Sequence, residues 1–435
     1  MKNSKIFQYI VLGIFIFFIV IGAVLFATYR SKSSSQIAAN ITMWGTLPAE
    51  SVNNFTNTYL NNIKVKSVIK YKEIDQENFD RDLVEALAAG DGPDAIILPE
   101  DLIMRFSNKI YTIPYTVLPE LTFKQTYIQE GELYMTSDGI LALPFTVDPL
   151  VMYWNRDIFN NVGLTKPPVY WSEVFDINSK ITKKDISKNI SRSTVALGEF
   201  QNVTNAKEIL AALIMQAGNP IVTRHATYNT LSSVLANSQV TKNAPASVAV
   251  EFYTNFSNPN RPEYSWNRSL PSSLDTFANG DLAIYFGFAS EYLKIKDKNP
   301  NLNFDVTFLP QSQEPKAVFS TYGNMMGLAI LKNSKQAAAT YSLLSSLASA
   351  EAVPFWTNSF NLPSARRDIL AQSEKNAAKT IFSKSAVMSR GWLDPNSSET
   401  DLIFKEMIES YTTGRSTINA AVQTASDKLN TLLQK

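Results

Sequence analysis

The chain has 435 residues, of which 45% are hydrophobic and 18% charged, so it can bury a sizeable core and form about two to three domains. With 40 basic and 39 acidic residues, it has no basic excess to drive nucleic-acid binding. The absence of cysteine excludes disulfides, thiolate metal sites and cysteine nucleophiles, and the single histidine, His225, leaves no set for a zinc centre or a catalytic triad.

The N-terminal part of the chain has the pattern of a membrane anchor. Residues 6–27 carry no charged side chain, and a helix of this length would cross the roughly 30 Å hydrocarbon core of a bilayer. A cleaved signal peptide normally has a shorter apolar region, so we expect an uncleaved signal anchor, with cleavage as the alternative. Residues 1–5 would form a cytoplasmic tail, and residues 28–40 a polar linker to an extracytoplasmic domain. We therefore expect a single-pass protein of the cell membrane.

Alternating strand and helix patterns follow the linker. The sequence predicts strands over residues 41–44, 65–71 and 95–98, separated by helices over residues 50–60 and 75–90. This order indicates a parallel α/β unit, in which ligands bind beyond the carboxyl ends of the strands. The candidate ligand-binding residues at those ends are Trp44, Thr46, Glu100 and Asp101. The alternative is that Trp44 is a core residue and that the two acids cap the next helix.

Residues 139–155, reading GILALPFTVDPLVMYWN, contain two apolar runs on either side of a short polar crossing. Continuous apolar runs of this length are typical of strands that are buried on both faces. Pro149 cannot donate a ladder hydrogen bond and favours an extended conformation at Asp148. We therefore expect the chain to leave one α/β lobe and enter a second here, with Asp148 at the boundary as a candidate ligand contact. A loop inside a single domain is the alternative.

Several segments resemble a known family. LVEALAAGDGPDAIILPED at residues 83–101 and ALPFTVDPLVMYWNRDIF at residues 142–159 are similar to the helix–strand and crossover segments of bacterial extracellular solute-binding proteins of the maltose-binding-protein-like class. These proteins are the binding subunits of ABC importers. LDTFANGDLAIY at residues 274–285 and the C-terminal residues 414–433 resemble later segments of the family. Tyr170 departs from the small polar residue that is usual before a helix of the second lobe.

The resemblance implies an α/β fold with two lobes, a hinge and a cleft between the lobes, preceded here by one transmembrane helix. The first lobe would comprise residues 41–147 plus about 305–335, and the second residues 148–304 plus about 336–435, with a second crossing near residues 304–310. It also implies ligand contacts in the cleft at Glu199, Asn202, Thr204, Phe288, Tyr322 and Trp392. Without the resemblance, the polar residues of this set are capping residues and Phe288 is a core residue.

The sequence contains no phosphate-binding loop, no nucleophile elbow and no HExxH metal motif. Carboxylates and amides can hydrogen-bond the hydroxyl groups of a sugar, while aromatic rings cover its apolar faces. We therefore expect a binding protein and not an enzyme, whose ligand is by resemblance an oligosaccharide and whose partners are ABC permease subunits. We expect no cofactor, no metal and no nucleic-acid partner, and a monomer. The alternatives are an anchored extracellular glycoside hydrolase with a carboxylate pair and a ligand-sensing receptor domain.

Overall fold

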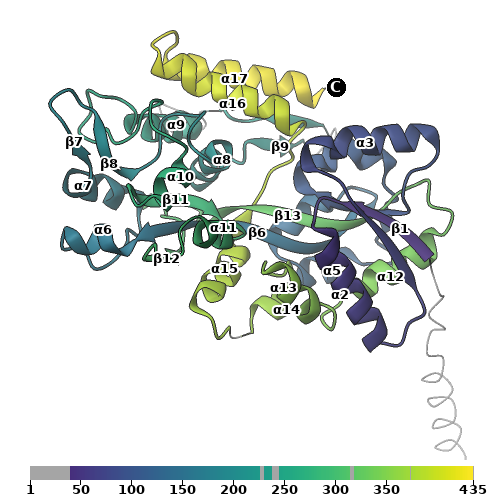
Figure 1. Ribbon diagram of the computed structural model, residues 1–435. Helices are drawn as coiled ribbons and strands as arrows, with labels where there is room; N and C mark the ends of the chain where they lie inside the picture. Colours follow the sequence, from purple (N-terminus) through teal and green to yellow (C-terminus); the bar gives the residue numbers. More distant parts are fainter. Residues whose placement is uncertain (1–39, 226–229, 238–243, 314–317, 373, 435) are drawn as a thin grey trace, which may run out of the picture.

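The computed structural model describes residues 40–225, 230–237, 244–313, 318–372 and 374–434. Within these residues the chain forms a sheet of ten strands that extends through both halves of the molecule and is covered by helices (Figure 1). The predicted membrane segment at residues 6–27 lies outside the described residues. None of the helices that the structure describes is long and apolar enough to cross a membrane.

The strands of the main sheet follow the order β2 (Val68–Glu73), β1 (Asn40–Gly45), β3 (Ala95–Pro99), β13 (Thr321–Ile330), β6 (Ala142–Asn155), β11 (Leu282–Phe288), β8 (Ile190–Val195) and β7 (Lys183–Lys184). In addition, β12 (Phe304–Thr307) pairs with β6, and β14 (Ser389–Arg390) pairs with β13. Two smaller sheets pair β9 (Val222–Arg224) with β10 (Leu231–Ser233) and β4 (Ile113–Pro114) with β5 (Gly139–Ile140). β1 is parallel to both β2 and β3, which confirms the predicted α/β unit.

The helices connect and cover these strands. Those before the middle of the chain are α2 (Ala49–Asn62), α3 (Gln76–Ala89), α4 (Ile103–Phe106), α5 (Glu120–Thr126), α6 (Arg156–Asn161), α7 (Trp171–Ile181) and α8 (Ala206–Gln216). Those after it are α9 (Pro245–Asn255), α10 (Ser273–Ala278), α11 (Glu291–Lys298), α12 (Ala337–Leu347), α13 (Val353–Phe360), α14 (Arg367–Leu370), α15 (Ala377–Met388), α16 (Ser397–Thr412) and α17 (Ile418–Leu433). Short 3-10 helices are η1 (Glu100–Leu102), η2 (Ser107–Lys109) and η3 (Gln129–Tyr134). Helices α16 and α17 lie side by side on the outside of the sheet (Figure 1).

Helix α3 shows how the local sequence sets the ends of an element. Phe79 and Leu83 are buried on one face of the helix. Gly90 follows its last turn in the left-handed region with φ of 79°, which glycine adopts without a steric penalty. Asp75 occupies the N-cap position, as the sequence predicts, but its side chain makes no capping hydrogen bond. The helix therefore depends on packing and on its C-terminal glycine more than on an N-cap.

Strand β6 joins the two halves of the sheet. It runs without a break through Asp148 and Pro149, where we expected a polar crossing between two strands. Its first part pairs with β13, and its second part pairs with β11 and β12, all in antiparallel register. Pro149 has no N–H, but its carbonyl accepts a hydrogen bond from the N–H of Ala289 at 3.0 Å. The proline is thus accommodated inside the strand and does not end it.

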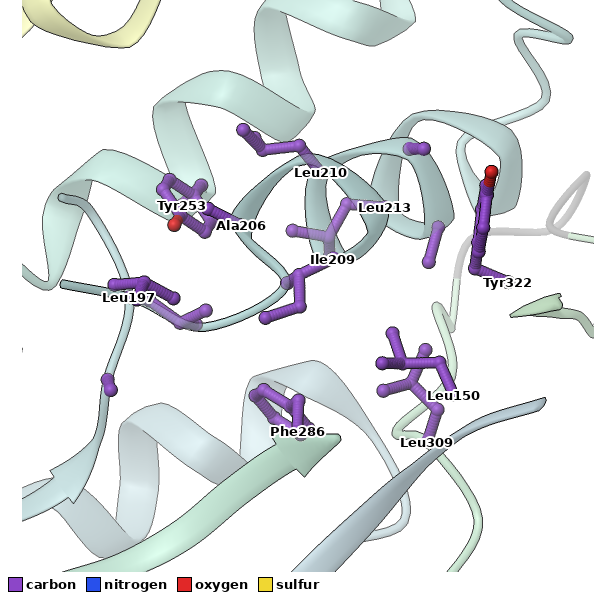
Figure 2. Packing of buried hydrophobic residues seen from close by; sticks show 14 of the residues in the cluster. Leu150, Leu197, Ala206, Ile209, Leu210, Leu213, Tyr253, Phe286, Leu309 and Tyr322 are labelled. Atoms are coloured by element: carbon purple, nitrogen blue, oxygen red, sulfur yellow. The ribbon is translucent and has the colours of Figure 1, made fainter. Parts of the chain in front are cut away.

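Each of the two parts of this strand contributes to a separate cluster of buried hydrophobic side chains. The first contains Val147 and residues of β1 and β3, and the second contains Leu150 and residues of α8. Figure 2 shows Ile209 and Leu213 of α8 in the second cluster, close to Leu150. The chain therefore forms two lobes, called here the first and the second lobe after their clusters, and β6 crosses between them at Asp148.

The other crossings differ from the sequence prediction. Residues 304–310 do not cross, because β12 pairs with the second-lobe part of β6 and its Val306 packs in the second cluster. The crossing is made by β13, whose Tyr322 packs in the second cluster and whose Met325 packs in the first. A third crossing contains β14 and leads to Trp392 in the second cluster. Helices α12 and α13 pack in the first cluster, where we expected second-lobe residues, and the full division of the chain into lobes stays a prediction.

Candidate functional site

Two acidic residues follow β3 directly, and the first of them is buried. Glu100 is 3% exposed. Its Oε1 accepts a hydrogen bond from the Tyr322 hydroxyl at 3.0 Å, and its Oε2 accepts one from the N–H of Met325 at 3.4 Å. Burial, and after it the neighbouring Glu130, holds the pKa of Glu100 well above its ordinary value. Glu100 therefore joins η1 to the crossing strand β13 and does not face solvent.

The second acid, Asp101, lies at the boundary between the lobes. Burial raises the pKa of its carboxyl group, and the negative charge of Asp394 raises it further. Lys207 and Ser397 act in the opposite direction and lower it. Lys207 belongs to α8 and Ser397 to α16, both of which pack in the second cluster. Asp101 is therefore a first-lobe carboxyl group that faces second-lobe residues, as expected for a group at the edge of a cleft.

Lys207 is the centre of a buried ionic cluster that the sequence analysis missed. Its Nζ lies 3.3 Å from Asp394 Oδ2 and 3.1 Å from Asp401 Oδ1, and it donates a hydrogen bond to Ser397 Oγ at 2.9 Å. Burial alone would lower the pKa of Lys207, but Asp394, Glu208 and Asp401 together raise it. The lysine therefore stays charged and fixes the start of α8 against α16. No motif in the sequence marks it, since its partners lie nearly two hundred residues away in the chain.

A pocket with a volume of about 480 Å³ opens at the first turn of α8. The residues that line it include Phe200, Gln201, Glu208, Asp401 and Lys405. Burial raises the pKa of Glu208, and the nearby Lys207 lowers it. The helix N-terminus adds partial positive charge at the same place. A wall of this kind can exchange several hydrogen bonds with a polyhydroxylated molecule while the ring of Phe200 covers an apolar face of it.

The loop before α8 lines this pocket, but not with the residues that the sequence analysis selected. Asn202 donates from Nδ2 to two carbonyls of residues 267–270, both at 2.9 Å. Its Oδ1 accepts a hydrogen bond from the indole N–H of Trp266 at 3.1 Å. Asn202 is therefore engaged inside the second lobe, and Phe200 and Gln201 line the pocket in its place. Irregular turn geometry decides which side chains of a loop face outward, and no periodicity in the sequence reports it.

Glu199 and Thr204 also have partners within the second lobe. One guanidinium nitrogen of Arg268 lies 3.1 Å from Glu199 Oε2. The N–H of Thr204 donates to the hydroxyl of Ser273 at 2.8 Å. These contacts hold the loop against α10 and the segment before it. A ligand contact by either residue stays a prediction.

Asp148 lies where β6 crosses between the lobes, and its carboxyl group is directed to α11. Its Oδ1 accepts a hydrogen bond from the N–H of Ser290, the residue before α11, at 3.0 Å. Burial raises the pKa of Asp148 to about 7. The hydrogen bond therefore ties the crossing strand to the second lobe, and a ligand contact by Asp148 stays a prediction.

Three of the aromatic candidates are buried. The rings of Phe288 and Tyr322 meet edge to face, with 6.4 Å between their centroids. Trp392 is 2% exposed and packs beside Phe404 at a centroid distance of 6.2 Å. Phe288 and Tyr322 are thus packing partners where two crossings meet the second lobe, and none of the three rings is open for a ligand to stack on in this arrangement.

The candidates at the end of β1 keep more exposed surface. Trp44 is half-buried, and Lys72 Nζ lies 4.2 Å from the centre of its ring system. Thr46 is also half-buried, in the turn after β1. Trp44 is thus partly buried against the first cluster, and a ligand contact by Trp44 or Thr46 stays a prediction.

Comparison with known protein families identifies the family of this chain. Residues 60–354 match the family described as bacterial extracellular solute-binding protein. The chain belongs to this family. The resemblance found in the sequence is therefore confirmed, and the matched residues include strands and helices of both lobes and the crossing strands β6 and β13.

Solved structures with a similar fold include three proteins that this solute-binding protein matches over nearly its whole described length. A cyclo/maltodextrin-binding protein complexed with maltotetraose has a TM-score of 0.73 at 15% identity, covering 91% of this chain and 97% of that one. An ABC transporter solute-binding protein from Thermotoga lettingae TMO, bound with alpha-D-tagatose, has a TM-score of 0.67 at 17% identity, covering 91% of this chain and 100% of that one. The GacH receptor of Streptomyces glaucescens GLA.O, solved unliganded and with acarbose, has a TM-score of 0.69 at 14% identity, covering 92% of this chain and 99% of that one. Identities this low show the fold alone. No curated protein matches the sequence.

The fold thus places some of the candidate residues at the boundary between the lobes and others inside the second lobe. Glu100, Asp101 and Tyr322 meet where β3 and β13 reach the second lobe. Asn202 is used inside the second lobe. Within the part of the chain that the structure describes, no group of three or more His, Cys, Asp or Glu side chains could hold a metal ion.

Proposed function

We propose that this solute-binding protein captures an oligosaccharide between its two lobes and delivers it to an ABC importer. The observation that carries the proposal is the polar pocket at the start of α8, which combines carboxylates, an amide and the ring of Phe200. The first-lobe carboxyl group of Asp101 faces the same ionic cluster from across the boundary. The ligands of two of the similar structures, maltotetraose and acarbose, support the saccharide class.

Capture would involve closure of the two lobes on the ligand. Three crossings connect the lobes, and rotation about them would bring Trp44, Thr46 and Asp101 toward the pocket wall at Gln201 and Glu208. A ligand that contacts both walls stabilises the closed arrangement by its difference in affinity for the two states. A permease could then recognise the closed arrangement.

We also propose that residues 6–27 anchor the protein to the cell membrane, with the two lobes on the extracytoplasmic side. The support is the uncharged apolar sequence of these residues and the absence of a cysteine that could carry a lipid. Anchoring would keep the binding lobes at a high effective concentration near their transporter.

The proposal is tested by thermal unfolding of the full chain in detergent with maltotetraose, acarbose and tagatose. A ligand at 100 times its dissociation constant adds about 2.7 kcal/mol to the free energy of unfolding, which raises the melting temperature by about 3 °C for a protein of this size. We expect a saturable rise with at least one saccharide, which is recovered uncleaved. Recovery of cleaved sugar would favour the hydrolase alternative. No rise with any of the three would contradict an oligosaccharide receptor.

A further inference from the structure

Glu130, which the sequence analysis did not single out, forms a buried acid pair with Glu100. Glu130 lies in η3 and is 2% exposed, and Glu100 lies in η1 and is 3% exposed. Both carboxyl groups adjoin the same stretch of β13, Glu130 beside Gly323 and Glu100 hydrogen-bonded to Tyr322 and Met325, and the charge of Glu130 raises the pKa of Glu100. Among the described residues, no group donates a well-formed hydrogen bond to either oxygen of Glu130. The neighbouring hydroxyl of Ser389 lowers the pKa of Glu130 but donates its hydrogen bond to the carbonyl of Ser385 at 3.3 Å.

This geometry favours one proton between the two carboxyl groups. Two carboxylates in contact and away from water repel each other strongly, and a buried oxygen without a donor carries a desolvation penalty. A shared proton removes one of the two charges and gives Glu130 a hydrogen-bond partner. In agreement with this, burial raises the pKa of Glu130 to about 7, and burial together with Glu130 raises the pKa of Glu100 well above its ordinary value.

The other groups around the pair can compensate one negative charge but not two. The titratable and charged side chains that face it are Asp101 of η1, Tyr134 of η3, Tyr322 of β13 and Arg390 of β14. Arg390 is the cation among them, and its charge lowers the pKa of Glu130. Asp101 adds negative charge, while the two tyrosines are neutral donors at physiological pH. Loss of the shared proton would thus leave one carboxylate without a cation.

The pair is packed directly against two of the three crossings. A Cβ atom at Gly323 of β13 would lie 2.5 Å from Glu130 Oε2. A Cβ atom at Gly391, the residue after β14, would lie 2.6 Å from Glu100 Oε2. Glycine is required at both positions because the backbone of each crossing rests on a carboxyl group. A change in the separation of the two carboxyl groups therefore moves one crossing relative to the other.

We propose that Glu100 and Glu130 hold one proton between them, and that its release to solvent at alkaline pH separates the carboxyl groups and changes the relative position of the lobes. Glu130 is a positioning residue, which acts through Glu100 on Tyr322 and the two crossings. The conformational effect stands independently of the ligand, and its consequence for saccharide capture rests on the proposed function. Above neutral pH, the lobes would become less restricted and the saccharide would bind more weakly.

The test measures the distance between the lobes as a function of pH in the full chain. Because the chain contains no cysteine, spin labels can be attached specifically at Glu85→Cys on α3 and Lys180→Cys on α7, exposed positions on the first and the second lobe. Pulsed EPR distances are recorded from about pH 5.5 to about pH 9, a range that includes the titration of a carboxyl group with a strongly raised pKa. We expect the distance distribution to shift or broaden on going above neutral pH.

Three variants separate the proton from general effects of substitution. Glu130→Gln and Glu100→Gln each replace one carboxyl group of the pair by an uncharged amide, so two negative charges can no longer face each other at high pH and the pH-dependent change should disappear in both. Glu132→Gln is the matched control, because Glu132 lies in the same 3-10 helix, is 41% exposed and also acts on Arg390. It should behave like the parent protein. Circular dichroism at each pH verifies that every variant is folded.

A parent protein without any pH-dependent distance change would overturn the inference, and so would a change that persists in folded Glu130→Gln. Titration of maltotetraose into the same samples gives the second readout. A pH-dependent distance change in a protein that binds no saccharide would refute the proposed function and leave the proton-holding pair in place.

Discussion

Gln201 and Asn202 are neighbours in the chain with opposite environments. Asn202 makes three hydrogen bonds that hold the segment after Trp266, whereas Gln201 is exposed at the pocket. We expect Asn202→Ala to lower the free energy of unfolding by about 2 to 3 kcal/mol, because a buried indole N–H and two carbonyls lose their partner. Gln201→Ala should change it by less than about 0.5 kcal/mol and weaken saccharide binding. Urea unfolding and a binding titration of both variants check this, and the reverse pattern would refute the assignment.

The two acidic partners of Lys207 differ in the same way. Asp394 is 3% exposed, and Asp401 has a side chain that is 54% exposed. Removing one partner of a buried ion pair leaves an uncompensated charge, so Asp394→Ala should lower the free energy of unfolding by about 3 to 5 kcal/mol. Asp401→Ala, the matched control, should lower it by less than about 1 kcal/mol. Equal losses in chemical denaturation would show that burial does not govern this cluster.

At the scale of elements, the fit between the crossing strand β13 and its neighbours can be tested at Gly323. A Cβ atom there would lie 2.5 Å from Glu130 Oε2 and 2.8 Å from the Cβ of Ser389. We expect Gly323→Ala to lower the free energy of unfolding by about 1 to 3 kcal/mol, since β14 and η3 must both shift. At Gly92 the closest atom is the flexible end of Leu87, so Gly92→Ala should have a smaller effect. Thermal unfolding of the two variants compares them, and equal effects would contradict close packing at the crossing.

Elements set by local patterns could be predicted from the sequence, and elements set by distant partners could not. The end of α3 at Gly90 follows from the glycine, and β1 and β3 follow from their apolar runs. The continuity of β6 through Pro149 depends on β13 and β11, which come much later in the chain. For the same reason the sequence showed that acids follow β3, but not that Glu130 adjoins the same crossing strand as Glu100.

At the scale of the whole molecule, the buried acids at the crossings make stability depend on pH. Burial raises the pKa of Asp148 to about 7, so the folded protein binds more protons than the unfolded chain at intermediate pH. The free energy of unfolding should therefore fall as the pH rises from about 4 to about 7. Asp148→Asn keeps an acceptor for the N–H of Ser290 and should show a smaller fall. Urea unfolding at several pH values measures this, and identical slopes in both proteins would contradict the raised pKa.

Family and two-lobed fold could be predicted for the whole molecule because matching segments follow one another in order along the chain. The pocket could not be predicted, since its wall combines the loop at residues 200–205 and the first turn of α8 with two residues of α16 that the chain reaches much later. The sequence analysis selected Glu199, Asn202 and Thr204 from the same loop, whereas Phe200 and Gln201 line the pocket. Lobe assignment of the later helices failed in places because packing, and not chain order, decides where α12 and α13 lie.

The most direct test of the account is a calorimetric titration of maltotetraose into the full chain and two variants. Glu208 lines the pocket, while Glu406 on α16 is exposed and pairs with Lys428. We expect the parent protein and Glu406→Gln to bind with equal affinity, and Glu208→Gln to bind about ten-fold more weakly, since a charge-assisted hydrogen bond is lost. Binding that is unchanged in Glu208→Gln would place the saccharide elsewhere, and absence of binding in the parent protein would contradict the pocket as a maltotetraose site.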